Sequence, residues 1–166
     1  MNGKCRHHRI INLANSMELK QLHKTIPYKW RVQQFSKNKP SASCVAYIDA
    51  RDVMQLLDEV CGADKWQSDF KEVAGQVYAG IGIKVDSEWV WKWDTGAESN
   101  MEKEKGLASD SFKRAAVKWG VGRFLYDLDV KYVPTNEAKT GSNYPFVVDI
   151  NGKRVFDLTK FINEMK

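Results

Sequence analysis

This 166-residue sequence has little cysteine and no long hydrophobic run. Its three cysteines, Cys5, Cys44 and Cys61, lie far apart and form no CxxC pair, which argues against a disulfide framework and for a reducing compartment. No apolar stretch approaches the roughly 20 residues that cross a bilayer, and the run over residues 10–14 is too short for a signal peptide. The sequence therefore predicts a protein without membrane segments that works in the cytoplasm.

Common catalytic motifs are also missing. The sequence contains no GxxxxGKS/T, GxSxG or HExxH, and two of its three histidines, His7 and His8, lie close to the first residue. We therefore expect no enzyme activity, no cofactor and no bound metal. One catalytic alternative stays open, a metal-dependent nuclease, and its carboxylates would come from Asp64, Asp69, Asp86, Asp94 and Asp110.

Acidic residues are outnumbered by basic ones. The chain has 26 Lys and Arg against 21 Asp and Glu, a net charge of +5, which suits a protein that binds nucleic acid. No acidic residue interrupts the basic residues of one segment, which are Lys20, Lys24, Lys29, Arg31, Lys37 and Lys39. Solvated surfaces usually mix both signs, so this segment favours a polyanionic partner.

The order of apolar patterns predicts an α+β fold in a single domain over residues 17–166, preceded by a flexible leader over 1–16. Cys5, His7 and His8 supply only part of a four-ligand zinc site, so we favour a leader there. Three runs separated by tight turns predict antiparallel hairpins, at 66–73, 76–85 and 88–94. Further strands are expected at 28–34 and 44–48, and a hairpin at 146–158 around Asn151-Gly152. Helices are expected at 17–25, from Asp49 to Gly62, at about 101–119 and at 159–165.

The helix over 101–119 has one apolar stripe and an adjacent pair of cations. The stripe comprises Met101, Ala108, Phe112, Ala115, Ala116 and Trp119. Lys113 and Arg114 lie off this stripe and are free to face a phosphate. They are equally compatible with a solvated face, or with ion pairs to Asp110, which lies three and four residues earlier.

Trp89, Trp91 and Trp93 alternate along one expected strand and therefore share a face of the sheet. They could stack on nucleic-acid bases or form the core on which the helices pack. We favour the core, with Val90 and Lys92 on the outer face. Gly80 and Gly82, within the preceding strand, indicate a bend or a close approach of another group.

Three short motifs, in this order and spacing, resemble the Rad fifty-two/twenty-two (Rad52/22) family of single-strand annealing proteins. They are IPYKWRV at 26–32, VAYIDAR at 45–51 and SDSFKRA at 109–115, and the resemblance spans about residues 26–128. The phage-borne and DdrA-like branches look most similar. The resemblance implies an antiparallel sheet of three or more strands packed on a long helix, with short flanking helices. It also implies assembly into rings and ATP-independent annealing of DNA strands in homologous recombination or double-strand break repair.

The resemblance further implies which residues line a groove for single-stranded DNA. These are Lys113 and Arg114 on the helix, Tyr47, the loop residues Lys37 and Lys39, Arg31, and Lys103 and Lys105 early in the helix. The expected partners are single-stranded DNA and further copies of the chain, in a ring or a helical assembly. Eukaryotic relatives contact a single-strand-binding protein through a long C-terminal region that this sequence lacks, but such a protein stays a candidate partner.

The resemblance places the protein in the cytoplasm of a bacterial or phage-infected cell. Two non-catalytic alternatives stay open beside the nuclease. One is a passive protein that protects single strands or DNA ends, and the other is an α+β interaction module without affinity for DNA.

Overall fold

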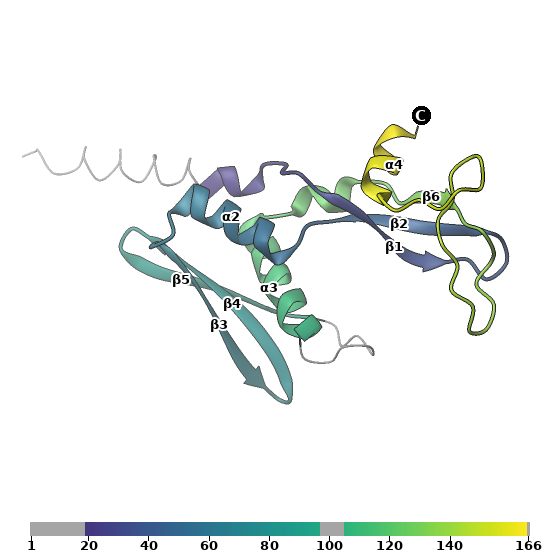
Figure 1. The fold of residues 1–166 in the computed structure, drawn as a ribbon. Coiled ribbons are helices and arrows are strands. Elements are labelled where there is room, and N and C mark those ends of the chain that lie inside the picture. Colours follow the sequence, from purple (N-terminus) through teal and green to yellow (C-terminus); the bar gives the residue numbers. More distant parts are fainter. Residues whose placement is uncertain (1–18, 97–104, 166) are drawn as a thin grey trace, which may run out of the picture. The chain divides into compact units, whose positions relative to one another are not determined.

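The computed structural model describes residues 19–96 and 105–165, which form two compact units (Figure 1). Unit 1 holds the described residues up to Ile26 together with Asp49–Phe124, and unit 2 holds Pro27–Ile48 and the chain from Leu125 onward. The expected leader lies outside the described residues, and so do Met101 and Lys103. The single domain expected over 17–166 stays a prediction. No described helix has both the length and the apolar character needed to cross a membrane.

Unit 1 contains an antiparallel sheet of three consecutive strands, β3 (Trp66–Val73), β4 (Gln76–Val85) and β5 (Glu88–Thr95). The two connecting turns have left-handed backbone, with φ of 52° at Ala74, 76° at Gly75, 48° at Asp86 and 74° at Ser87. Consecutive positive φ angles give the tight turns that match the twist of paired strands. The three predicted runs and both turns are confirmed.

Unit 1 also contains helical elements, and the capping signals in the sequence mark one of them, α2. Their bounds are η1 (Gln21–His23), α2 (Ala50–Cys61), α3 (Lys105–Trp119) and the beginning of η2 (Arg123–Asp127). Asp49 is confirmed as the N-cap of α2, because its carboxylate accepts from the backbone N–H of Arg51 and Asp52 while Asp52 accepts from that of Asp49. Gly62, with φ of 90°, ends the helix.

Helix α3 packs on β4 and β5, and α2 lies on the same side of the sheet (Figure 1). The centre of the contact is apolar, and its members are all buried: Ala79, Ile81, Ile83, Phe112, Ala115, Ala116 and Trp119. The Trp119 indole N–H donates to the carbonyl of Ile81 over 2.9 Å. The predicted apolar stripe of this helix is thus confirmed from Phe112 onward.

The predicted orientation of β5 is wrong. Val90 and Lys92 pair with Ile83 and Ile81 and face α3, whereas Trp91 and Trp93 pair with Gly82 and Gly80 on the opposite face. The reason lies in β4, where isoleucines on one face alternate with glycines on the other. The isoleucines fill the space beneath the helix, and the glycines leave room for indole rings on the outer side.

Unit 2 contains a second antiparallel sheet with strand order β1-β2-β6. The bounds are β1 (Lys29–Phe35), β2 (Ser41–Tyr47) and β6 (Lys131–Pro134), and helix α4 (Leu158–Glu164) packs on β1. The backbone N–H of Trp30 donates to the Thr159 hydroxyl over 3.0 Å, and its indole N–H donates to the Asn163 side chain over 3.2 Å. These bonds fix α4 over the core of this unit.

One face of the unit 2 sheet carries that core, which comprises Trp30, Ala42, Cys44, Val133, Val147 and Ile162. Burial raises the pKa of the Cys44 thiol, so the thiol stays neutral. The hairpin predicted at 146–158 is present but short, with a bridge between Val148 and Arg154 and backbone hydrogen bonds from Val155 to Val147 and from Asp149 to Lys153. Its second strand is short because Asp157 already caps α4, accepting from the backbone N–H of Lys160.

Candidate nucleic-acid interface

The outer face of the unit 2 sheet, opposite its core, combines cations with tyrosines. Lys29 pairs with Tyr47 and Arg31 with Val45, so alternation along each strand places Lys29, Arg31 and Tyr47 on this face. The Arg31 guanidinium lies 5.9 Å from the centre of the Tyr47 ring, within the range of a cation–π contact. The structure thus brings two predicted site residues, Arg31 and Tyr47, into one cluster.

Two side chains on this face are missing from the sequence-based site. Lys29 lies two residues before Arg31, so the strand alternation was a sufficient signal for it. Tyr132, which is 67% exposed, pairs with Ser43 across the β2–β6 ladder. Because β6 is far from β2 in the sequence, no local pattern could have placed it there.

The loop between β1 and β2 carries the predicted cations Lys37 and Lys39, and both are exposed. It is closed by a backbone hydrogen bond of 2.8 Å from the N–H of Ser36 to the carbonyl of Ser41. No carboxylate among the described residues forms an ion pair with either lysine. The two side chains therefore extend the cationic surface of unit 2 to the end of its hairpin.

In unit 1, the carboxylate of Asp94 on β5 faces two cations of α3. Arg114 Nε lies 4.0 Å from Asp94 Oδ1, and Lys118 Nζ lies 3.7 Å from Asp94 Oδ2. Residues four apart share a face of a helix, which is why both cations reach one partner. The ion pair considered between Asp110 and the cations of the helix is not found within the described residues.

Two further cations hold the C-terminal end of α3. Arg123 Nε donates to the carbonyl of Val117 over 2.9 Å, and Lys92 Nζ donates to that of Lys118 over 2.9 Å. The carbonyls at the end of a helix carry partial negative charge and attract cations. Burial lowers the pKa of the Lys92 ammonium, and the nearby Arg123 guanidinium lowers it further. These two cations are part of the structure of unit 1.

Lys113 differs from its neighbours on the helix. One residue advances an α-helix by about 100°, so Lys113 projects from a different side than Arg114 and Lys118. Its side chain is half-buried, and no described carboxylate pairs with it. Among the described cations of α3, Lys113 is therefore the one whose charge has no acidic partner.

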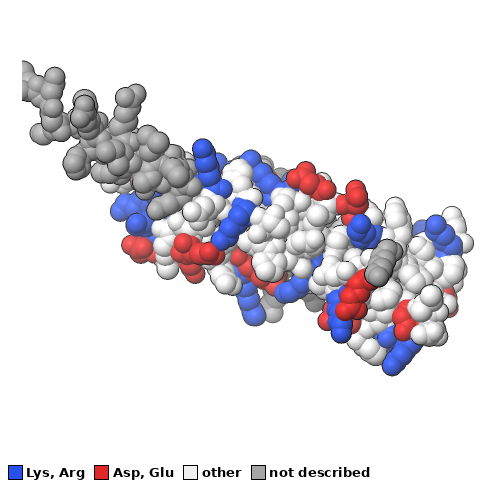
Figure 2. Space-filling view, turned by 90° about the horizontal axis from the view of Figure 1, so that it is seen from above, with Lys and Arg blue, Asp and Glu red and all other residues white. Residues whose placement is uncertain are grey.

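The predicted site residues are divided between the two units, and two of them have no described side chain. Lys103 and the side chain of Lys105 lie outside what the structure describes. Lys113 and Arg114 belong to unit 1, whereas Arg31, Lys37, Lys39 and Tyr47 belong to unit 2. Each unit thus carries predicted site cations of its own. On the face shown in Figure 2, basic and acidic side chains are interspersed among uncharged ones.

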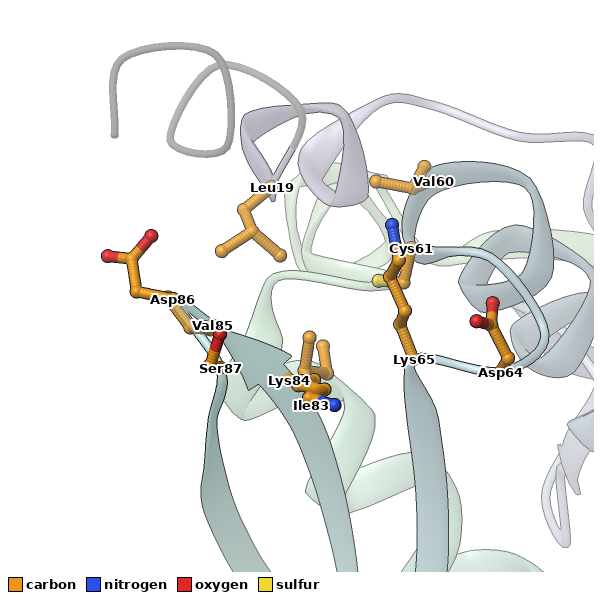
Figure 3. Close-up of a pocket in the computed structure, with 10 residues that line it drawn as sticks. All are labelled: Leu19, Val60, Cys61, Asp64, Lys65, Ile83, Lys84, Val85, Asp86 and Ser87. Carbon is orange, nitrogen blue, oxygen red and sulfur yellow. The ribbon is translucent and has the colours of Figure 1, made fainter. Parts of the chain in front are cut away.

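An open pocket of about 360 Å³ lies in unit 1, where the C-terminal end of α2 meets the end of β4 and its turn to β5 (Figure 3). It is lined by both signs of charge, from Asp64, Lys65, Lys84 and Asp86, and by the thiol-bearing Cys61. Two of the five aspartates considered for a nuclease, Asp64 and Asp86, line it, and the other three do not. Residues 19–96 and 105–165 contain no group of three or more His, Cys, Asp or Glu side chains able to hold a metal ion.

Taken together, the α+β architecture and the predicted site cations on each unit are typical of proteins that contact polyanions. Residues 9–144 match the family described as "Rad52/22 family double-strand break repair protein". Because this match covers most of the sequence, the chain belongs to that family.

Two curated relatives have informative names. The single-stranded DNA-binding protein DdrA of Deinococcus radiodurans is 32% identical over 117 residues, which cover 69% of this chain and 56% of the relative. The protein of the same name from Deinococcus deserti is 36% identical over 112 residues, which cover 66% of this chain and 55% of the relative. The chain spans about half the length of the curated relatives it matches.

Proposed function

We propose that the chain binds single-stranded DNA through its phosphates and anneals complementary strands without ATP, in homologous recombination or double-strand break repair. The family membership and the names of the two relatives support single-strand binding. The observation that carries the mechanism is the half-buried Lys113 on α3, which no described carboxylate neutralises. Arg114 and the cationic surface of unit 2 would add further phosphate contacts.

Electrostatics explains how such a protein would speed annealing. Two DNA strands repel one another through their phosphates, and cations that neutralise one strand release its counterions and lower that repulsion. Phosphate contacts position a strand without reading its sequence. Bases left open to solvent then select their complement by pairing, so the protein needs neither base recognition nor nucleotide hydrolysis.

Assembly into a ring or a helical array would multiply these contacts. β3 and β5 are edge strands of the unit 1 sheet, as β1 and β6 are in unit 2, and an edge strand presents unpaired N–H and C=O groups to another chain. Repeated head-to-tail contacts close into rings or continue as helices. Linked weak sites then bind a long strand tightly.

Annealing of two complementary oligonucleotides, followed by energy transfer between dyes without any nucleotide, tests the proposed activity. The protein should accelerate duplex formation over the protein-free rate, and static light scattering should show a mass well above one chain. A protein that binds one strand but leaves the annealing rate unchanged would be a passive protector, the alternative that the relatives' names favour. Cleavage of a labelled strand with Mg²⁺ or Mn²⁺ would instead indicate a nuclease.

A further inference from the structure

The outer face of the unit 1 sheet, on the side away from α2 and α3, carries a row of aromatic rings. We call it the tryptophan face, and it comprises Trp89, Trp91 and Trp93 on β5, Gly80, Gly82 and Lys84 on β4, and Lys71 on β3. No described helix of unit 1 covers it. A row of partly exposed aromatic rings that no described helix covers is a candidate site of interaction.

The glycines of β4 hold two of the rings flat against the sheet. A Cβ atom at Gly80 would lie 2.6 Å from the Trp93 ring, and one at Gly82 would lie 2.7 Å from the Trp91 ring. The two rings stack on each other, with centroids 5.3 Å apart and planes inclined by 20°. The rings therefore lie along the sheet as a fixed layer rather than as loose side chains.

The third ring, Trp89, is the accessible one. It is 40% exposed, and it lies directly opposite Lys84 across the β4–β5 ladder. At the other end of the row, Lys71 Nζ lies 3.9 Å from the centre of the Trp93 ring. An exposed ring beside a lysine therefore begins the row, and a second lysine ends it.

We propose that the tryptophan face stacks unpaired bases of single-stranded DNA, with Trp89 as the contacting ring and Lys84 and Lys71 meeting the adjoining phosphates. This inference rests on the proposed function and assigns it a second kind of contact, on the side of the sheet opposite the cations of α3. Aromatic side chains on an open sheet are a common platform for unpaired bases. Once a DNA strand has annealed, its bases stack inside the duplex and no longer reach the tryptophan face. The tryptophan face would therefore release the annealed product.

The charges of this face favour a nucleic acid over a second copy of the chain. Lys71 and Lys84 stand among the rings, and lysine is depleted in the buried centres of protein interfaces. Asp69 is the one described acidic side chain on this face, and its carboxylate accepts from the backbone N–H of Phe70. Rings beside cations match the base and phosphate of a nucleotide.

Two oligonucleotides of equal length, one of thymidines and one of abasic spacers, separate stacking from phosphate binding. Trp89→Ala should weaken binding to the thymidine strand about tenfold, the effect of losing one stacked base, and leave binding to the abasic strand unchanged. Trp89→Phe should restore most of the affinity. Phe70→Ala removes a ring of similar exposure from the other face of the same sheet and should change neither affinity.

Three results would overturn the assignment. Equal affinity of Trp89→Ala and the wild type for thymidine strands would show that the ring touches no base. An equal loss on both oligonucleotides would show that the ring supports the fold or the phosphate contacts. A change in oligomeric mass with Trp89→Ala would make the face a subunit interface. Failure of the wild type to bind either strand would instead refute the proposed function itself.

Discussion

At the scale of single residues, the cations of α3 differ in whether they pair with Asp94. Its carboxylate lies 4.0 Å from Arg114 Nε and 3.7 Å from Lys118 Nζ, whereas Lys113 has no acidic partner in the described part of the chain. Both pairs are half-exposed, and ion pairs of that kind contribute about 0–1 kcal/mol. A phosphate can therefore compete with Asp94 for either cation.

Asp94→Asn should strengthen binding of single-stranded DNA at low salt by about threefold, the scale of one exposed ion pair released to a new partner. The amide keeps an oxygen for the Thr95 N–H, which now donates to Asp94 Oδ1 over 2.8 Å. Fluorescence anisotropy measures the affinity. Glu72→Gln, the same change of charge on β3, is the matched control, and an equal gain there would trace the effect to net charge alone.

At the scale of elements, the packing of indole rings on glycines is the feature of unit 1 most sensitive to substitution. Gly80→Ala would place a methyl group 2.6 Å from the Trp93 ring, closer than atoms pack. We expect the free energy of unfolding to fall by about 1–3 kcal/mol, as overpacked sites show, in denaturant titrations followed by circular dichroism.

A double-mutant cycle identifies the cause of that loss. In a Trp93→Leu background the flat ring is gone, so Gly80→Ala should cost much less than in the wild type. An undiminished cost would mean that the methyl group clashes with something other than the ring, and the flat packing of Trp93 would be wrong.

The sequence was sufficient for most elements of unit 1 but not for the faces of its sheet. Turn residues and caps gave the bounds of α2, β3, β4 and β5, because Asp49, Gly62 and the two turns act through local backbone chemistry. Which side of β5 meets α3 depends on its partner strand, and a single strand with apolar residues on both faces does not reveal it. Taking Gly80 and Gly82 together with the tryptophans would have given the correct side.

In the candidate site, too, local features could be predicted from the sequence and contacts between different elements could not. Lys113 and Arg114 could be predicted as site residues because they adjoin a clear apolar stripe. The sequence could not show that Asp94 engages Arg114, since the two lie on different elements. The pairing of Arg31 with Tyr47 was available only through the register of β1 and β2. Residues brought together by non-local pairing are the ones that sequence periodicity misses.

At the scale of the whole molecule, the net charge of +5 is modest and its effect depends on where the cations are free. Lys92 and Arg123 hold the end of α3, while Lys113 and the exposed loop residues Lys37 and Lys39 have no carboxylate partner among the described residues. An assembly of many copies would repeat these few cations along one strand. Its affinity should therefore depend steeply on salt and little on sequence.

The most direct test is the salt dependence of single-strand binding for the wild type and Lys113→Ala, with Lys160→Ala on α4 as the control of equal charge. Each lost phosphate contact lowers the slope of log K against log salt by about 0.7 for a single strand. Lys113→Ala should lower the affinity and reduce the slope by about that amount without changing the oligomeric mass, while Lys160→Ala should match the wild type. A slope for Lys113→Ala equal to that of the wild type would contradict phosphate binding by α3.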